Sequence, residues 1–201
     1  MFSRFPKDRI NNFCDAVFAI AMTLLILEIK IPADEFIREY GTLTALRQLL
    51  PNFLGFFITF LVTAVYWRSH LRLAQYIKEY DNRLLWLTIF LLLFVVLLPF
   101  STALYSQSGN YNGPFVFYCL NLVAIGLLNY FMVRYVVRNQ GYDETLTRPR
   151  AALLKVKAIS APLVWAIAAV WVLVEPISAR FMFLLIFAAI PFIERRFKGK
   201  V

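Results

Sequence analysis

Fifty consecutive residues, from Leu84 to Val133, carry no charged side chain. A helix of about 20 apolar residues crosses the roughly 30 Å hydrocarbon core of a bilayer, so this stretch is long enough for two crossings. Two further uncharged runs, Gln48 to Trp67 and Ala158 to Val174, are 20 and 17 residues long. The chain is 61% hydrophobic, against about 45–50% in soluble domains. These features predict an all-α membrane protein.

Turn-forming residues divide the hydrophobic sequence into segments. The run SQSGNYNGP, residues 106–114, separates the two crossings of the longest stretch. The acidic segment IPADEFIREYGT, residues 31–42, is predicted to form a short interfacial helix. No loop is long enough for a second domain, so we predict one domain over residues 1–201 with six transmembrane helices. They are expected at about 11–31, 47–69, 83–105, 114–137, 153–174 and 178–194.

The basic residues predict how the chain is threaded through the membrane. With the N-terminus in the cytoplasm, 17 of the 21 Lys and Arg residues fall on cytoplasmic stretches and four on the other side. Cytoplasmic loops carry an excess of Lys and Arg, so both termini are expected in the cytoplasm. The net charge of +9 follows from this topology and from contact with anionic lipid headgroups. Nucleic-acid binding is excluded as a partner class, because the basic residues are spread over short loops beside the membrane.

The first segment carries an acid near its start. In the stretch CDAVFAIAMTLLILEIK, residues 14–30, only 12 uncharged residues separate Asp15 from Glu28, which is short for a helix surrounded by lipid. An ionisable residue at membrane depth normally faces the interior of a bundle and has a partner. Two interpretations remain open at this point. Either Asp15 is buried within an assembly near the cytoplasmic end, or it caps the start of the helix at the interface.

An apolar stripe follows one side of this segment. Ile20, Leu24, Leu27 and Ile31 are spaced by four, three and four residues, and Thr23 lies beside them. Four copies of such a helix around an axis would form a narrow tube lined by aliphatic side chains. Periodicity alone favours an ordinary packing face, because most packed helices show such a stripe.

Three short motifs carry a family resemblance. Arg9, followed after three residues by FCDAVFAIAMTLL, resembles the R-x-x-x-F-S-D…A-I-x-x-T-L-L signature of the transmembrane protein 175 potassium channel family, in particular its bacterial branch. FLVTAVYWRSHLRL resembles the W-x-x-H element of that family, with Trp67 and His70, and LLPFSTAL fits the end of the third helix. Cys14 stands where the family usually has serine, which replaces a good hydroxyl donor with a weak thiol.

The resemblance implies a homotetrameric, potassium-permeable channel with the first helix around a central pore. It implies that Ile20 forms the narrowest ring, that Leu24 and Leu27 lie further out, and that Thr23 influences selectivity. K⁺ would be the main permeant ion, with Na⁺ and other monovalent cations passing more weakly, and no cofactor or bound metal is expected. The bacterial branch implies the inner (plasma) membrane.

A second group of residues belongs to the inner mouth. Trp67 and His70 are three residues apart, on one face of the second segment. Arg9 and Asp15 are six apart and do not pair easily within one straight helix, so contact through the second segment or across subunits is expected. We interpret the four as a structural polar network. For His70, a pH sensor and a solvated interfacial residue are alternatives.

Two other function classes were weighed. An enzyme embedded in the membrane needs paired carboxylates, a histidine cluster or a Ser/His pair at depth, whereas this chain has one histidine and Asp15 alone. No enzyme activity is therefore expected. A secondary transporter of a small cation or solute is the main alternative to a channel, and it would show coupled, saturating flux. Inverted-repeat transporters have paired interrupted helices in two halves, a pattern this sequence lacks.

Overall fold

The computed structural model describes residues 5–108, 111–139 and 146–197. Apart from one isolated β-bridge between Phe5 and Tyr80, the regular elements in these ranges are helices. In chain order they are α1 (Lys7–Leu24), the 3-10 helix η1 (Leu25–Glu28), α2 (Asp34–Tyr40), α3 (Thr42–Tyr76), α4 (Asn82–Val96), α5 (Leu98–Gln107), α6 (Asn112–Asn139), α7 (Arg148–Trp171), α8 (Pro176–Arg180) and α9 (Leu184–Phe197).

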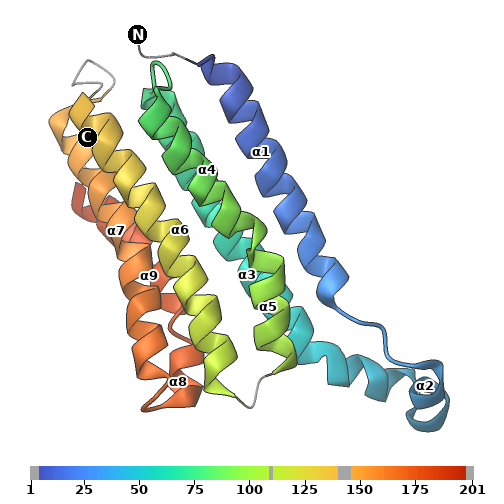
Figure 1. Ribbon diagram of the computed structural model, residues 1–201. Coiled ribbons are helices and arrows are strands. Elements are labelled where there is room, and N and C mark those ends of the chain that lie inside the picture. Colours follow the sequence, from blue (N-terminus) through green and yellow to red (C-terminus); the bar gives the residue numbers. More distant parts are fainter. Residues whose placement is uncertain (1–4, 109–110, 140–145, 198–201) are drawn as a thin grey trace.

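The long helices run side by side along one direction (Figure 1). α6 packs against α7 on one side and against α4 and α5 on the other, and α9 packs on α7. α1 lies at one flank of the bundle, where it contacts α3 and α4. One side of α1 is therefore not covered by its own chain.

Five helical segments are long and apolar enough to cross a membrane, among the residues that the structure describes. They are Lys7–Glu28, Thr42–Tyr76, Asn82–Gln107, Asn112–Asn139 and Arg148–Trp171. These match the first five predicted segments, with ends that differ by at most seven residues. The prediction of an all-α membrane protein is confirmed.

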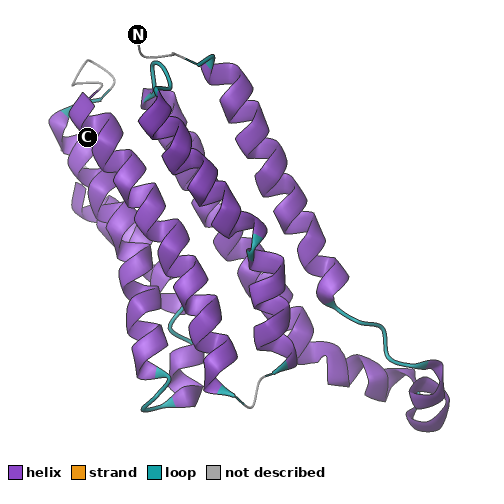
Figure 2. Cartoon of the chain, viewed as in Figure 1, coloured by secondary structure: helices purple, strands orange, loops and turns teal. Residues whose placement is uncertain are grey.

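The third predicted segment is two helices rather than one. α4 ends at Val96 and α5 begins at Leu98, and the two are separated by Leu97, which keeps helical backbone angles (Figure 2). Pro99 explains the break, because proline has no backbone N–H and its ring clashes with the carbonyl four residues earlier, here that of Val95. The chain continues in nearly the same direction, so the segment still spans as a unit.

The sixth predicted segment, 178–194, is not one continuous helix. It is divided between α8 and α9, which are joined by a turn over residues 181–183. The backbone N–H groups of Met182, Leu184 and Leu185 bond to carbonyls three residues back rather than four, so the chain is wound more tightly here than in an α-helix. Neither helix reaches the length of the five candidate spans, and a sixth crossing stays a prediction.

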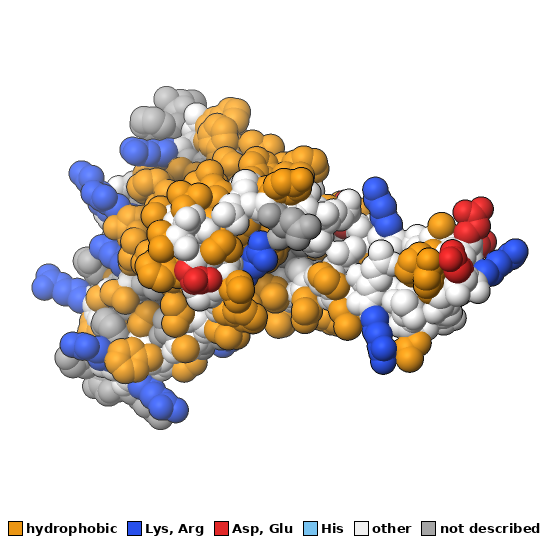
Figure 3. All heavy atoms as spheres, turned by 90° about the horizontal axis from the view of Figure 1, so that it is seen from below, with side chains coloured by type: hydrophobic (Ala, Val, Ile, Leu, Met, Phe, Trp, Pro, Cys, Tyr) orange, Lys and Arg blue, Asp and Glu red, His pale blue; other side chains and the backbone are white. Residues whose placement is uncertain are grey.

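The predicted interfacial helix is present as α2, which projects beyond the bundle on the side of α1 (Figure 1). Gly41 follows it with φ of +79°, a conformation that favours glycine, and allows α3 to start in a new direction. Seen from this end, the acidic side chains gather mainly on the projecting α2, while hydrophobic side chains cover much of the bundle (Figure 3).

Side-chain hydrogen bonds tie α3 to α5 and α6 inside the bundle. The Thr102 hydroxyl donates to Thr59 Oγ1 at 3.1 Å, and Thr59 also bonds to the Tyr118 hydroxyl at 3.0 Å. The Tyr66 hydroxyl donates to the carbonyl of Leu122 at 3.0 Å. Because lipid offers no hydrogen bonds, polar groups at this depth are stabilised by bonding to one another.

Some predicted features fall outside the described residues. Gly109 and Asn110 of the 106–114 turn, positions 140–145 of the predicted cytoplasmic loop and both chain ends (1–4 and 198–201) are among them. The connection from Gln107, where α5 ends, to Asn112, where α6 begins, lies within the predicted turn.

Candidate functional site on the first helix

α1 has one buried face and one exposed face. Cys14, Phe18, Ala21 and Leu25 follow a spacing of four, three and four, and each is at most 2% exposed. This face packs against the rest of the chain, because α1 contacts α3, α4 and α5. The packing stripe of the first helix is therefore a different one from the stripe that the sequence analysis singled out.

The predicted pore stripe lies on the exposed face. Ile20 is 57% exposed, Leu24 38% and Leu27 72%. Within one protomer these apolar side chains have few partners, so the ordinary packing interpretation does not hold for contacts inside the chain. Leu27 lies in η1, beyond the end of the α-helix.

Ile31 does not belong to this stripe. The helix ends at Glu28, and Ile29 already has an extended backbone with φ of −83° and ψ of 101°. Ile31 is 86% exposed and borders an apolar pocket that residues of α2 and α3 also line. The four-residue stripe predicted from spacing is therefore shortened to Ile20, Leu24 and Leu27, because spacing places residues on one face only while the helix continues.

Phe13 extends the exposed face toward the N-terminal end of α1. It is 61% exposed and lies seven residues before Ile20, which puts the two on the same side of the helix. Phe13 was not among the predicted pore residues, although its seven-residue spacing from Ile20 could have indicated it. The exposed face thus holds Phe13, Ile20, Leu24 and Leu27 along its length.

Thr23 lies on the same side of α1 and is also exposed. Its hydroxyl donates to the carbonyl oxygen of Ile20 at 2.8 Å. This back-bond uses the hydroxyl hydrogen within the helix and leaves the oxygen lone pairs available to accept a hydrogen bond or to approach a cation.

A hydrogen bond joins α1 to α3 near the predicted inner mouth. The Trp67 indole N–H donates to Asp15 Oδ1 at 2.8 Å, and both residues are half-buried. The Asp15 side chain faces α3 rather than capping its own helix, because the helix begins eight residues earlier at Lys7. The structure thus brings together two of the four residues expected in the polar network.

The other two residues are placed differently. Arg9 is exposed, and within the described part of the chain it makes no ion pair or hydrogen bond. His70 is 1% exposed, and its ring lies 6.1 Å from that of Phe18. Neither ring nitrogen of His70 has a hydrogen-bond partner among the described residues. In a single protomer, His70 is therefore packed beside the Asp15–Trp67 pair rather than bonded to it.

Tyr80, in the α3–α4 connection, fixes the N-terminal end of α1. Its carbonyl accepts from the Phe5 backbone N–H at 3.0 Å, and its hydroxyl donates to Asn11 Oδ1 at 3.0 Å. Burial raises the pKa of the Tyr80 hydroxyl well above its usual value, so it stays protonated and keeps donating at physiological pH. This anchor was not predicted from the sequence.

The described residues offer no metal centre. No group of three or more His, Cys, Asp and Glu side chains comes together in the ranges that the structure covers. Cys14 and Cys119 are both buried and both free thiols. The exposed apolar face of α1 is thus the feature that most needs a functional explanation.

Comparison with known proteins was made on sequence and on fold. Residues 9–99 match the family described as "Endosomal/lysosomal potassium channel TMEM175". A potassium channel of a Chryseobacterium species is 28% identical over 140 residues, which are 70% of each chain. A potassium channel of Chamaesiphon minutus is 37% identical over 99 residues, and here the match spans about half the length of each protein.

The fold comparison extends over nearly the whole chain. The crystal structure of a lysosomal potassium-selective channel TMEM175 homolog from Chamaesiphon minutus superposes with a TM-score of 0.80. The match covers 96% of this chain and 98% of the other, at 23% identity. The matched region of the family begins at Arg9 and ends at Pro99, so it contains the motifs of the first two segments and the first three residues of LLPFSTAL. The chain is therefore an integral membrane protein that matches the TMEM175 family of ion channels over residues 9–99 and shares its fold with a structure from that family.

Proposed function

We propose that this chain is a potassium channel in which four copies place α1 around a central axis. The observation that carries the proposal is the exposed apolar face of α1, with Ile20 at 57% and Leu27 at 72% exposure, on a helix that its own chain covers on one side only. The bacterial relatives named as potassium channels support the choice of ion.

Ile20 is proposed to form the narrowest ring. Leu24, at the end of α1, and Leu27, in η1, are proposed to lie further out along the pore. An apolar ring strips water from an ion without supplying oxygens in return. K⁺ holds its water less tightly than Na⁺, so the free-energy cost of dehydration on entry is lower for K⁺. The resulting preference is modest, and Na⁺ and other monovalent cations pass more weakly. The Thr23 oxygen, held one turn from Ile20, offers a polar group beside the ring.

The remaining features of the proposal concern topology and the inner mouth. We place both termini in the cytoplasm of a bacterial cell, on the distribution of Lys and Arg, and α8 with α9 as the sixth crossing. Asp15, Trp67, His70 and Arg9 are proposed as a structural network, in which the exposed Arg9 finds a partner on a neighbouring subunit and the buried His70 packs beside the Asp15–Trp67 pair. The Asp15–Trp67 hydrogen bond supports this role within one protomer.

Replacing Ile20 with asparagine tests the ring. Ile20→Asn introduces a polar amide that lets water and ions enter, so we expect a larger conductance and a loss of the preference for K⁺ over Na⁺. The measurement is the reversal potential in planar bilayers, with K⁺ on one side and Na⁺ on the other. Ile167→Asn is the matched control, because Ile167 is an isoleucine of α7 that is 54% exposed, almost as much as Ile20.

The two substitutions separate the alternatives. The control should keep the wild-type reversal potential, since Ile167 lies on α7, which is not among the helices that pack against α1. If Ile20→Asn kept the wild-type preference for K⁺ over Na⁺, Ile20 would not form the constriction. Absence of unitary conductance steps in the wild-type protein, with flux that saturates and depends on a second ion, would favour the transporter alternative.

A further inference from the structure

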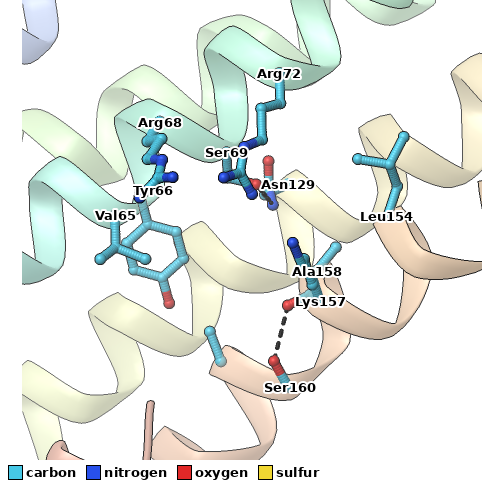
Figure 4. Close-up of a pocket in the computed structure, with 11 residues that line it drawn as sticks. Val65, Tyr66, Arg68, Ser69, Arg72, Asn129, Leu154, Lys157, Ala158 and Ser160 are labelled. Carbon is cyan, nitrogen blue, oxygen red and sulfur yellow. Dashed lines mark hydrogen bonds between the residues drawn. The ribbon is translucent and has the colours of Figure 1, made fainter. Parts of the chain in front are cut away.

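A basic cleft lies between α3, α6 and α7 (Figure 4). The residues that define it here are Arg68, Ser69 and Arg72 of α3, Asn129 of α6 and Lys157 of α7. It encloses about 80 Å³, room for several water molecules and hence for a phosphate group. We call it the α3–α7 cleft.

The charge of the cleft is of one sign. Two guanidinium groups and one ammonium group line it, and no acidic side chain does among the described residues. The cations come from two helices that are far apart in sequence, so the fold brings them together. Arginine binds phosphate oxygens through parallel N–H groups, and lysine adds a point charge. This set of donors fits a phosphate ester.

The depth of the cleft in the membrane can be read from the three helices. Arg68 is the first charged residue after the uncharged run that ends at Trp67, and Lys157 is the last before the run that starts at Ala158. Asn129 lies five residues before Arg134, which ends the uncharged stretch of α6. All three helices therefore change from apolar to charged at the level of the cleft. That level is where lipid headgroups lie.

Asn129 gives a second, independent indication of a ligand. It is 3% exposed, and its Nδ2 donates to Ser69 Oγ at 3.0 Å. Its Oδ1 is buried and has no hydrogen-bond partner within the described residues. In Figure 4 its side chain lies between Ser69 and Arg72 on one side and Lys157 on the other. Buried amide oxygens are normally paired, so a donor from a bound molecule would complete this site.

We propose that the α3–α7 cleft binds the headgroup of an anionic phospholipid in the leaflet on the side of the α1 N-terminus. Arg68, Arg72 and Lys157 contact the phosphate, and a headgroup hydroxyl donates to Asn129 Oδ1. Apolar residues of the same cleft, Val65 and Ala161, lie one turn further into the membrane and contact the start of an acyl chain. A free phosphate ester has the same polar chemistry but would leave these apolar contacts unused.

Native mass spectrometry of the purified full-length protein in detergent tests the proposal. The three probes are phosphatidylglycerol, phosphatidylcholine and soluble glycerol 3-phosphate. Phosphatidylglycerol is expected to bind at least tenfold more tightly than phosphatidylcholine, because its headgroup carries a net negative charge. Glycerol 3-phosphate should not bind measurably. Binding of the soluble ester as strong as that of the lipid would reassign the cleft to a free phosphate compound.

Paired substitutions test the location. Arg68→Gln with Lys157→Gln removes two cations of the cleft and should weaken phosphatidylglycerol binding at least fivefold. Arg148→Gln with Arg196→Gln is the matched control, because it removes two exposed cations elsewhere and should change binding less than twofold. If both double variants lost the same binding affinity for phosphatidylglycerol, the attraction would come from the general surface charge and the proposed site would be wrong.

A change in the lipid tests Asn129 without risk to folding. Phosphatidylmethanol has the same phosphate charge but no headgroup hydroxyl, so it should bind several-fold more weakly than phosphatidylglycerol. Equal affinity for the two lipids would overturn the role of Asn129. None of these measurements depends on ion conduction, so failure of the lipid site and failure of the proposed channel are separate results.

Discussion

At the residue scale, Asp15 decides how α1 is held. It is a carboxylate in a segment that is otherwise apolar, and the structure pairs it with the indole N–H of Trp67 from α3. A hydrogen bond to a charged group contributes on the order of 1.5–3 kcal/mol, and its loss would also leave the indole N–H without a partner. The pair therefore stabilises the position of α1 against α3.

Asp15→Ala is expected to lower the thermal stability of the protein by several degrees and to reduce the yield of assembled oligomer. Asp15→Asn keeps an acceptor oxygen for Trp67, so its effect should be smaller. Asp8→Ala is the control, because Asp8 is an exposed acid in the first turn of the same helix. Size-exclusion chromatography and thermal unfolding in detergent measure both effects. A well-assembled Asp15→Ala protein with altered K⁺ over Na⁺ preference would instead place Asp15 in the permeation path.

At the element scale, the contact between α6 and α7 depends on one glycine. A Cβ atom added at Gly126 of α6 would lie 2.7 Å from Cδ of Pro162 in α7. Small residues let membrane helices approach closely, and here a proline ring occupies the space above the glycine. The Pro162 ring thus packs directly against α6, at a point where that helix presents no side chain.

Gly126→Ala is expected to push α6 and α7 apart and to destabilise the bundle by about 1–3 kcal/mol, the usual cost of overpacking a core. Gly113→Ala is the matched control, because it lies in the first turn of the same helix with no atom within 4 Å of the added Cβ. Thermal unfolding followed by tryptophan fluorescence compares the two. Equal unfolding temperatures for the two variants would show that α6 and α7 accommodate the added methyl group without loss of stability.

At the scale of the whole molecule, the two ends of the bundle differ in charge. The acidic side chains of α2 gather at one end, and most of the basic residues that flank the uncharged runs lie toward the other, namely Arg68, Arg83, Arg134 and Lys157, whereas Arg47 lies at the α2 end. This asymmetry is the basis for placing both termini in the cytoplasm. Chemical labelling of introduced cysteines can measure this orientation directly, because both native cysteines are buried.

Single cysteines at exposed positions report the orientation. Arg38→Cys in α2 is expected to react with a membrane-impermeant maleimide on intact cells, and Arg148→Cys at the start of α7 only after the membrane is permeabilised. The unsubstituted protein is the control and should label weakly under both conditions, since Cys14 and Cys119 are 0% exposed. The opposite labelling pattern would place the termini outside.

Much of the fold could be predicted from the sequence, for a simple physical reason. In lipid, a backbone must satisfy its hydrogen bonds within each segment, so a long uncharged run predicts a helix and its length predicts a crossing. Local chemistry was less predictable. Pro99 divides the third segment where the uncharged run continues, and the last segment turns at 181–183 without a clear signal in composition.

For the candidate site, the spacing of residues along the chain was enough to predict which of them share a helical face, because the angle between successive side chains on a helix is fixed. Which face is buried depended on the packing of the helices. This packing assigned Cys14, Phe18 and Ala21 to the packing face and left Ile20, Leu24 and Leu27 exposed, because burial depends on where α3 and α4 lie. It likewise joined Asp15 to Trp67, and Arg68 to Lys157 across one cleft, since contacts between distant segments arise only when the helices pack.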